Sequence, residues 1–157
     1  MKRIWLLALF VFPLLLGLVV CTGCPLTAAA PAAAPVDFAA QRANVPQGLW
    51  IWIDLHQKSL TLYQGVQVKQ RYVIATGTGQ TPSPIGVYRI THRFSGDLGG
   101  FGTRFLGLNV PWGQFGIHGT NRPESIGRNA SHGCIRMLID DCKYISDLPL
   151  HTTVIIY

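Results

Sequence analysis

The 157-residue sequence predicts a mostly β fold, a sandwich or open barrel with one short helix near the C-terminus. Short β-prone apolar runs, separated by turn residues, recur from residue 49 to the end of the chain. Only the stretch 140–147, which starts with two acidic residues, favours a helix, because carboxylates are stabilised at a helix N-terminus. The length fits one small domain, and about 110 residues can enclose one core.

The expected strands follow one another with short connections. The run 50–55 is strongly apolar and β-prone, and the runs 59–63 and 66–75 flank a Gln64-Gly65 hairpin turn. A loop rich in glycine, threonine and proline follows at 77–84. The other expected elements are strands at 87–91, 105–110, 115–118 and 153–157, and a mobile, glycine-rich loop at 94–103.

The first 24 residues have the composition of an export signal. Lys2 and Arg3 precede an apolar run from residue 4 to 20, which is slightly short for a membrane span of about 20 residues. Cys24 follows a small residue, as the lipidated cysteine of a bacterial lipoprotein does, although Cys21 stands where such a signal prefers an aliphatic residue. Lipidation at Cys24, ordinary cleavage and retention as an anchor all stay open.

The composition of the segment after the signal predicts a tether. Residues 25–35 are almost all alanine, proline and threonine, which cannot form a packed core and favour an extended chain. We therefore expect a signal, anchor or lipoprotein signal at 1–24, a tether at 25–47 and a folded domain at 48–157. The protein is expected outside the cytoplasm, with the membrane reached only through its N-terminal signal, anchor or the lipid on Cys24.

The charge is modest. The formal net charge is +6, and without Lys2 and Arg3 the remaining 11 basic residues exceed the 7 acidic ones by 4. An ordinary surface explains this excess best, and attraction to anionic cell-wall polymers or to substrate carboxylates is the alternative. No basic run with interleaved aromatic residues is present, so nucleic acid is not an expected partner. Nothing marks an oligomer interface, and we expect a monomer.

Cys134 and His118 form the most informative pair in the sequence. A thiol becomes a strong nucleophile when an imidazole can take its proton, and the two residues are far enough apart to come from different elements. Gly133 permits a sharp turn before the thiol. Backbone amides near Cys134 can then stabilise the oxyanion of a tetrahedral intermediate.

This constellation resembles the L,D-transpeptidase catalytic domain family (YkuD-like). The family signature is a His-Gly pair, a spacer and Ser/Thr-His-Gly-Cys followed by an aliphatic residue and Arg or Asn. His118-Gly119 and 131–136 match it. Two further landmarks, at 81–86 (Thr-Pro-Ser-Pro-Ile-Gly) and 111–117 (Pro-Trp-Gly-Gln-Phe-Gly-Ile), occur in the same order, and the likeness covers about 49–157.

The resemblance implies a peptidoglycan enzyme with Cys134 as nucleophile and His118 as general base. A Cys134 thioester with a tetrapeptide stem would give L,D (3–3) cross-links or exchange the terminal D-amino acid. An L,D-carboxypeptidase, if water replaces the amine, and a non-catalytic peptidoglycan-binding surface module are the alternatives. No cofactor is expected. A zinc site is disfavoured because His-x-Cys is not a common ligand spacing and no fourth ligand follows.

Other residues have supporting roles in this hypothesis. The carbonyl of Gly119 is the expected partner that orients His118, since no carboxylate stands at an obvious position. Ser131, His132 and Gly133 are expected to support the turn around the thiol. Arg136 either binds a substrate carboxylate or pairs internally. Trp112, Tyr88 and Phe101 are candidates for the substrate groove, and Cys142 is expected to pack in the core. The glycine-rich loop 99–102 is either a flap over the site or a plain connection.

Overall fold

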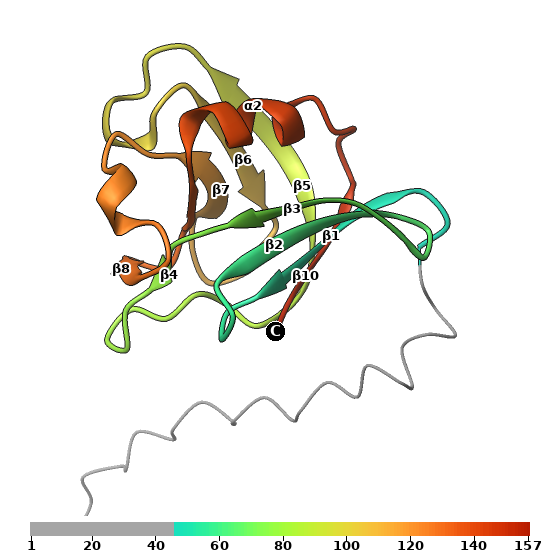
Figure 1. The fold of residues 1–157 in the computed structure, drawn as a ribbon, viewed down its shortest axis with the longest axis horizontal. Helices are drawn as coiled ribbons and strands as arrows, with labels where there is room; N and C mark the ends of the chain where they lie inside the picture. Colours follow the sequence, from blue (N-terminus) through green and yellow to red (C-terminus); the bar gives the residue numbers. More distant parts are fainter. Residues whose placement is uncertain (1–45) are drawn as a thin grey trace, which may run out of the picture. The chain divides into compact units, whose positions relative to one another are not determined.

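The computed structural model describes residues 46–157, which fold around one strongly curved β-sheet (Figure 1). Its strand order is β3-β2-β1-β10-β5-β6-β7-β9. The bounds are β1 Leu49–Asp54, β2 Ser59–Gln64, β3 Gln67–Val73, β5 Gly86–Ser95, β6 Arg104–Leu108, β7 Phe115–Gly119, β9 Ile135–Met137 and β10 Thr153–Ile156.

Most neighbours in this sheet are antiparallel, as expected for strands joined by short turns. The first three strands form a meander, and β5, β6 and β7 form a second one. Two parallel pairs join distant parts of the chain. Strand β10 lies between β1 and β5 and runs parallel to β1, while β9 runs parallel to β7.

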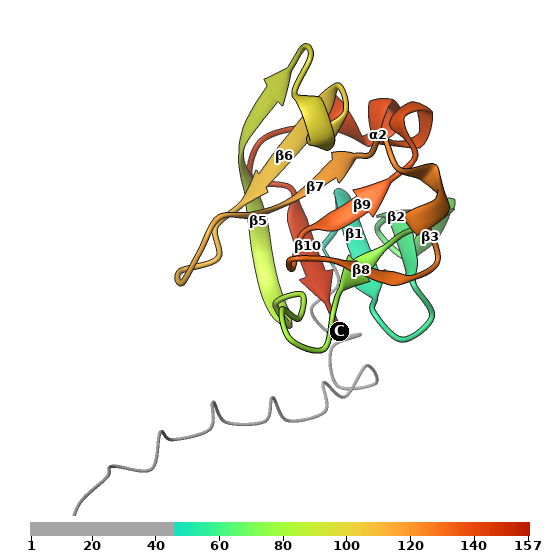
Figure 2. The ribbon, with the colours of Figure 1, turned by 90° about the vertical axis from the view of Figure 1, so that its left-hand side faces the viewer.

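The two edges of the sheet meet beyond β3. Ala75 forms an antiparallel bridge with Arg136 of β9, with N–H···O distances of 2.8 and 2.9 Å in the two directions. A short parallel pair, β4 (Thr76–Gly77) with β8 (Asn129–Ser131), continues the contact (Figure 2). The sheet is therefore nearly closed, which confirms the mostly β, barrel-like prediction.

The core fills the inside of this sheet. The helix α2 (Ile139–Ser146) packs against β6 and β7 and places Cys142 and Ile145 fully inside. The prediction that Cys142 packs in the core is confirmed. The largest fully buried side chains are Ile51, Ile53, Leu60, Ile74, Ile90, Leu106, Ile117, Ile135, Met137, Ile145, Ile156 and Val154.

Strand β5 is longer than the sequence predicted. The expected strand stopped at 91 and a mobile loop followed, but β5 continues to Ser95 because Phe94 and Ser95 pair with Phe105 and Arg104 of β6. The loop is correspondingly shorter and contains a 3₁₀ turn, η2 (Gly99–Phe101). The glycine-rich composition of 94–103 predicted a loop, but pairing with β6 extends the strand into the start of this stretch.

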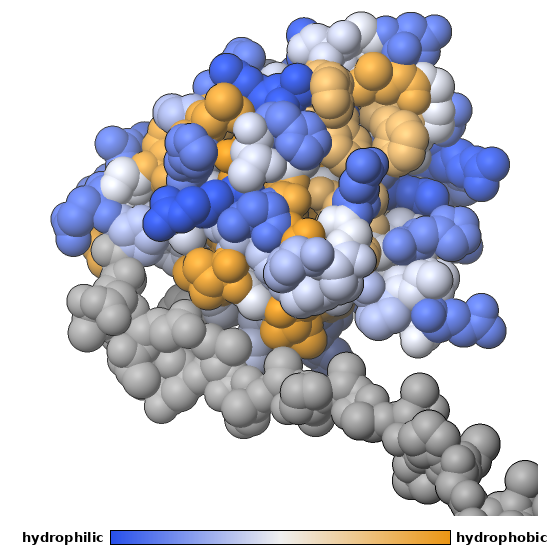
Figure 3. Space-filling model, turned by 180° about the vertical axis from the view of Figure 1, so that it is seen from behind, coloured by the Kyte–Doolittle hydropathy of each residue, from blue (hydrophilic) through white to orange (hydrophobic). Residues whose placement is uncertain are grey.

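The expectations for a signal, a lipidated Cys24 and most of the tether concern residues 1–45, which lie outside the described part. Within 46–157 no helix is long and apolar enough to cross a membrane. Apolar side chains on the face seen from behind alternate with hydrophilic ones (Figure 3). Such scattered exposure is ordinary for a folded protein surface.

Candidate active site

One cavity of about 650 Å³ contains both Cys134 and His118 in its wall. His118 comes from β7, and Cys134 stands in the turn between β8 and β9. The structure therefore brings the two together although 15 residues separate them in the sequence. The lining residues are Gly100, Phe101, Phe105, Gln114, His118, Thr120, Asn121, Arg122, Ser131, His132, Cys134 and Arg136.

The parallel pairing of β7 with β9 assembles this wall. His118 is the register partner of Arg136, and both side chains line the cavity. The preceding partners, Ile117 and Ile135, are buried in the core. Successive side chains of a strand point to opposite faces, so the apolar residues anchor the strands while the polar ones face the cavity.

Ser131 shapes the turn that carries the thiol. Its buried hydroxyl donates to the carbonyl of Cys134 at 2.5 Å and accepts from the amide of Gly133 at 3.0 Å. Gly133 has a φ of 112°, and a Cβ there would lie 2.5 Å from a ring carbon of Phe115. Only glycine combines this backbone conformation with such close packing. The expectation that Ser131 and Gly133 support the turn agrees with these contacts.

The 77–84 loop supports the same turn from outside. The amide of Thr78 donates to the carbonyl of Ser131 at 3.1 Å, and the hydroxyl of Thr81 reaches that carbonyl at 3.2 Å. Ser83 accepts from the amide of Gly77 at 2.9 Å, which closes the loop on itself. The loop that contains the Thr-Pro-Ser-Pro motif thus stabilises the turn at Cys134 through hydrogen bonds to the backbone of Ser131.

His118 is buried and held by a main-chain partner. Its Nδ1–H donates to the carbonyl of Gly119 at 2.5 Å, and this carbonyl is the partner expected from the sequence. A carbonyl can only accept, so this bond leaves Nε2 as the nitrogen without a proton. Burial lowers the pKa of His118, and the charge of Arg136 acts in the same direction, while hydrogen bonds with the backbones of Gly119 and Phe101 oppose both.

Cys134 is partly buried, and its thiol is shifted toward the protonated form. Burial raises the pKa of Cys134, although a hydrogen bond from the Gly116 backbone and the charge of Arg136 act against the rise. Since the pKa of His118 is lowered and that of Cys134 is raised, the neutral thiol–imidazole pair is the resting form near neutral pH. A neutral pair of this kind suits activation of a thiol by a general base better than a preformed ion pair.

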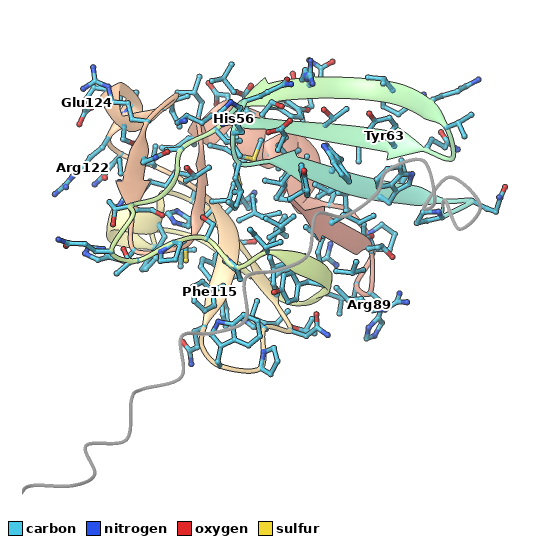
Figure 4. All side chains as sticks on the ribbon, turned by 90° about the horizontal axis from the view of Figure 1, so that it is seen from below. His56, Tyr63, Arg89, Phe115, Arg122 and Glu124 are labelled. Atoms are coloured by element: carbon cyan, nitrogen blue, oxygen red, sulfur yellow. The ribbon has the colours of Figure 1, made fainter. Side chains whose placement is uncertain are left out.

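The cavity is cationic. Arg136 is partly buried, and its Nε is one of the buried side-chain atoms in 46–157 without a hydrogen-bond partner. Among the described residues, the ion pair joins Lys143 to Asp140 and does not involve Arg136. Arg122 lines the cavity at the start of η3 (Pro123–Ser125) and projects with Glu124 from one end of the molecule (Figure 4). No acidic side chain lines the cavity.

Two of the predicted groove residues lie elsewhere. Tyr88 is buried, its hydroxyl donates to the carbonyl of Ile85 at 2.9 Å, and Trp112 packs edge-on against its ring. Neither residue lines the cavity around Cys134. Their placement in the substrate groove therefore gains no support from the geometry, because a buried Tyr88 serves the core.

No sequence motif indicated that Phe105, Gln114, Asn121 or Arg122 would line the cavity. Phe105 is the register partner of His118 across β6 and β7, and this pairing is not encoded in any local motif. Phe101, the third predicted groove residue, lines the cavity and packs edge-on against His118 with ring centroids 4.8 Å apart. His132, predicted to support the turn, is exposed and lines the cavity without an assigned hydrogen bond. Within 46–157 no group of three His, Cys, Asp or Glu residues is placed to hold a metal ion.

Comparison with known proteins relates this geometry to a family. Two curated relatives, from Bacillus licheniformis and Bacillus subtilis and each provisionally named L,D-transpeptidase YkuD, are 40% and 41% identical over 87 residues. These matches cover 55% of this chain and 52% of each relative, so the chain spans about half the length of the curated relatives it matches.

Solved structures support the same fold. A crystal structure of an L,D-transpeptidase (residues 123–326) from Xylanimonas cellulosilytica superimposes with a TM-score of 0.63 at 22% identity. The superposition covers 79% of this chain and 70% of the other. The family model described as the L,D-transpeptidase catalytic domain matches residues 48–156. The chain therefore belongs to the L,D-transpeptidase catalytic domain family.

Proposed function

We propose that this protein is a cysteine-dependent L,D-transpeptidase that acts on peptidoglycan tetrapeptide stems. The observation that carries the proposal is the shared cavity of Cys134 and His118, with His118 held on the Gly119 carbonyl so that Nε2 is free to accept a proton. Family membership supports the reaction class and the peptidoglycan substrate. The proposed place of action is outside the cytoplasm, at the cell wall.

The first step forms a thioester. Nε2 of His118 takes the thiol proton as the sulfur of Cys134 attacks the carbonyl carbon of the third, diamino acid residue of the stem. Backbone amides near Gly133 and Cys134 stabilise the resulting oxyanion. The C–N bond then breaks, the terminal D-amino acid leaves with the proton held by His118, and the acyl group stays on sulfur.

The second step resolves the thioester. The amine of a neighbouring stem loses a proton to His118 and attacks the acyl carbon, and the thiolate leaves and regains that proton. The product is a 3–3 cross-link, or an exchanged stem when the amine belongs to a free D-amino acid. Water in place of the amine would give a tripeptide, which is the carboxypeptidase outcome at the same site.

Arg136 is proposed to bind a carboxylate of the donor stem. Its Nε lacks a partner, no acidic side chain lines the cavity, and the guanidinium can bind a carboxylate through two parallel bonds. An Arg136→Gln variant should raise KM for the donor at least about tenfold, since a charge-assisted hydrogen bond contributes roughly 1.5–3 kcal/mol. Arg136→Lys retains the charge but loses the planar guanidinium, so its KM should lie between those of the wild type and Arg136→Gln.

Incubation with disaccharide-tetrapeptides, followed by mass spectrometry, tests the function. Cross-linked dimers or exchanged stems that are absent with Cys134→Ala would support the transpeptidase, and tripeptides alone would indicate the carboxypeptidase. If wild type and Cys134→Ala both leave the stems unchanged while both co-sediment with peptidoglycan, the enzymatic proposal fails and the binding module replaces it.

A further inference from the structure

We propose that Phe105 is a positioning residue for the His118–Cys134 pair, held in place by a trough of glycines in the neighbouring strands. The inference rests on the proposed role of His118 as the base for Cys134. It concerns a side chain that no sequence motif marks and that touches the imidazole rather than the thiol.

The rings of Phe105 and His118 lie side by side and nearly parallel across two neighbouring strands. Phe105 of β6 and His118 of β7 are register partners, with ring centroids 5.9 Å apart and planes inclined by 15°. Phe101 closes on the edge of the same imidazole at 4.8 Å and 76°. Stacked and edge-on contacts of this kind are favourable arrangements for aromatic rings. One face and one edge of the imidazole are therefore packed, and rotation about its Cβ–Cγ bond would break both contacts.

Two glycines explain why the Phe105 ring can lie there. A Cβ at Gly116 would stand 2.4 Å from Cζ of Phe105, so the ring occupies the space that a side chain at 116 would need. Gly107 is the register partner of Gly116, and a Cβ there would stand 2.0 Å from Nε2 of His92. The two glycines thus leave a trough on the sheet that the rings of Phe105 and His92 fill.

His92 completes a stack of three rings. Its ring lies 6.2 Å from that of Phe105 at an angle of 23°, on the side opposite to His118. Phe105, which is partly exposed, thus lies between two nearly parallel imidazoles and above Gly116, whose backbone also hydrogen-bonds the sulfur of Cys134. A ring packed in this way cannot move aside without displacing its neighbours.

The stack serves two tasks in the proposed chemistry. It keeps Nδ1 of His118 on the Gly119 carbonyl, and so keeps Nε2 toward the cavity that Cys134 shares. It also excludes water from the imidazole, and burial is the main cause that lowers the pKa of His118. The base therefore stays unprotonated at pH values where an exposed histidine would begin to lose its capacity to accept the thiol proton.

The charged and titratable groups around His118 are few. Cys134 and Arg136 come from the β8–β9 side, His132 and Arg122 from the wall of the same cavity, and His92 lies behind the Phe105 ring. A substitution at Phe105 alters none of these groups chemically. A change in the pH dependence of the Phe105 variants therefore reports the surroundings of the imidazole.

The test compares Phe105→Leu, Phe105→Tyr and a matched control, Phe94→Leu, in the full chain. Phe94 is the partner of Phe105 on β5, is exposed and has ring contacts with His92 and Phe105 but none with His118. Alkylation of Cys134 by iodoacetamide, read from the mass of the peptide that contains it, is followed from pH 5 to 9. This readout needs no peptidoglycan, so a failure of the proposed function would not be confused with a failure of this inference.

Phe105→Leu should move the acid limb of the alkylation profile to higher pH and lower kcat on stems about tenfold or more, because small displacements of a base are costly. KM should stay within about twofold. In Phe105→Tyr and in Phe94→Leu, the acid limb of the alkylation profile should lie at the same pH as in the wild type. An unmoved limb in Phe105→Leu, or a loss confined to KM, would overturn the inference.

A measurement on the intact stack covers the case in which Phe105→Leu does not fold. In Cys134→Ala with Phe105 intact, the carbon-bound ring protons of His118 should resonate upfield of exposed histidines because they face an aromatic ring. Nitrogen-15 shifts should give the Nδ1–H tautomer. Unshifted ring protons, or the opposite tautomer, would also overturn it.

Discussion

The hydroxyl of Ser131 and the carbonyl of Cys134 are joined by a 2.5 Å hydrogen bond across the turn that presents the thiol. The same hydroxyl oxygen accepts a hydrogen bond from the amide of Gly133. One buried side chain therefore holds the backbone of both residues that follow His132 in the turn. The main-chain carbonyl of Ser131 is in turn held by Thr78 and Thr81 of the preceding loop. The position of the thiol thus depends on a small network rather than on Cys134 alone.

Ser131→Ala should destabilise the protein and slow the reaction. It leaves a buried carbonyl and a buried amide without their partner, which costs about 1–3 kcal/mol of unfolding free energy. Urea denaturation measures that cost, and kcat on stems should fall with it because the thiol loses its fixed position. Ser131→Thr preserves the hydroxyl and is the control. Equal losses in the threonine and alanine variants would show that the hydrogen bonds are not the cause.

Gly133→Ala should be more damaging than the same change at another glycine with positive φ. Position 133 has a φ of 112°, and a Cβ added there would lie 2.5 Å from a ring carbon of Phe115, whereas a Cβ added at Gly127, at φ 82°, would meet Val73 as its nearest neighbour at 3.9 Å. We expect a loss of about 3 kcal/mol at 133 and about 1 kcal/mol at 127, since overpacking adds to the backbone strain. Urea denaturation of the two variants gives the difference, and equal losses would refute the role of the Phe115 contact.

Alkylation of the folded domain should select Cys134 over Cys142. Burial raises the pKa of Cys142 to about 12 and its side chain is fully enclosed, whereas Cys134 lines an open cavity. Peptide mass spectrometry after limited iodoacetamide treatment should find label at Cys134, with Cys142 labelled only after denaturation in urea. Early label at Cys142 in the folded protein would contradict the described core.

The unfolding free energy should decrease toward acid because of His118. Its pKa in the folded state is below the ordinary 6.5, so the unfolded chain binds the proton first as the pH falls below 6.5. Cys134 acts at the other end, because its folded pKa is above the ordinary 9.0 and the unfolded thiol ionises first as the pH rises past 9. The neutral pair is therefore most favourable to folding between these limits.

Urea titrations from pH 5 to 8 measure the acid part of this dependence. His118→Gln removes the titrating group and keeps a polar side chain, so its unfolding free energy should fall less steeply below pH 6.5 than that of the wild type. A steeper fall in the variant, or a wild-type stability that increases toward pH 5, would contradict the lowered pKa of His118.

The parts of the fold and site that could be predicted from the sequence are those determined by residues close together in the chain. The alternation of apolar runs and turns gave the meander β1–β3, and acidic residues at 140 and 141 marked the start of α2. The His-Gly and Ser-His-Gly-Cys motifs located His118 and Cys134, which the structure brings into one cavity. The absence of a carboxylate near His118 in the sequence favoured the carbonyl of Gly119 as its partner, and the structure places the two in hydrogen-bond contact.

The remaining parts depend on pairings between distant strands. The bridge from Ala75 to Arg136 closes the sheet, and the β6–β7 register sets Phe105 against His118. Neither follows from spacing along the chain, because a shift of one residue in register would send each side chain to the other face. For the same reason the sequence did not show that Tyr88, predicted to line the substrate groove, is buried on β5.

The most direct test of the central proposal is to trap the acyl-enzyme. The protein is mixed with a tetrapeptide stem, quenched within seconds in acid and measured by intact mass and by peptide mapping. We predict a mass gain equal to the stem without its terminal D-amino acid, located on Cys134, released by hydroxylamine and absent in Cys134→Ala. Cross-linked or shortened stems formed by Cys134→Ala, or an adduct on any residue other than Cys134, would contradict the proposal.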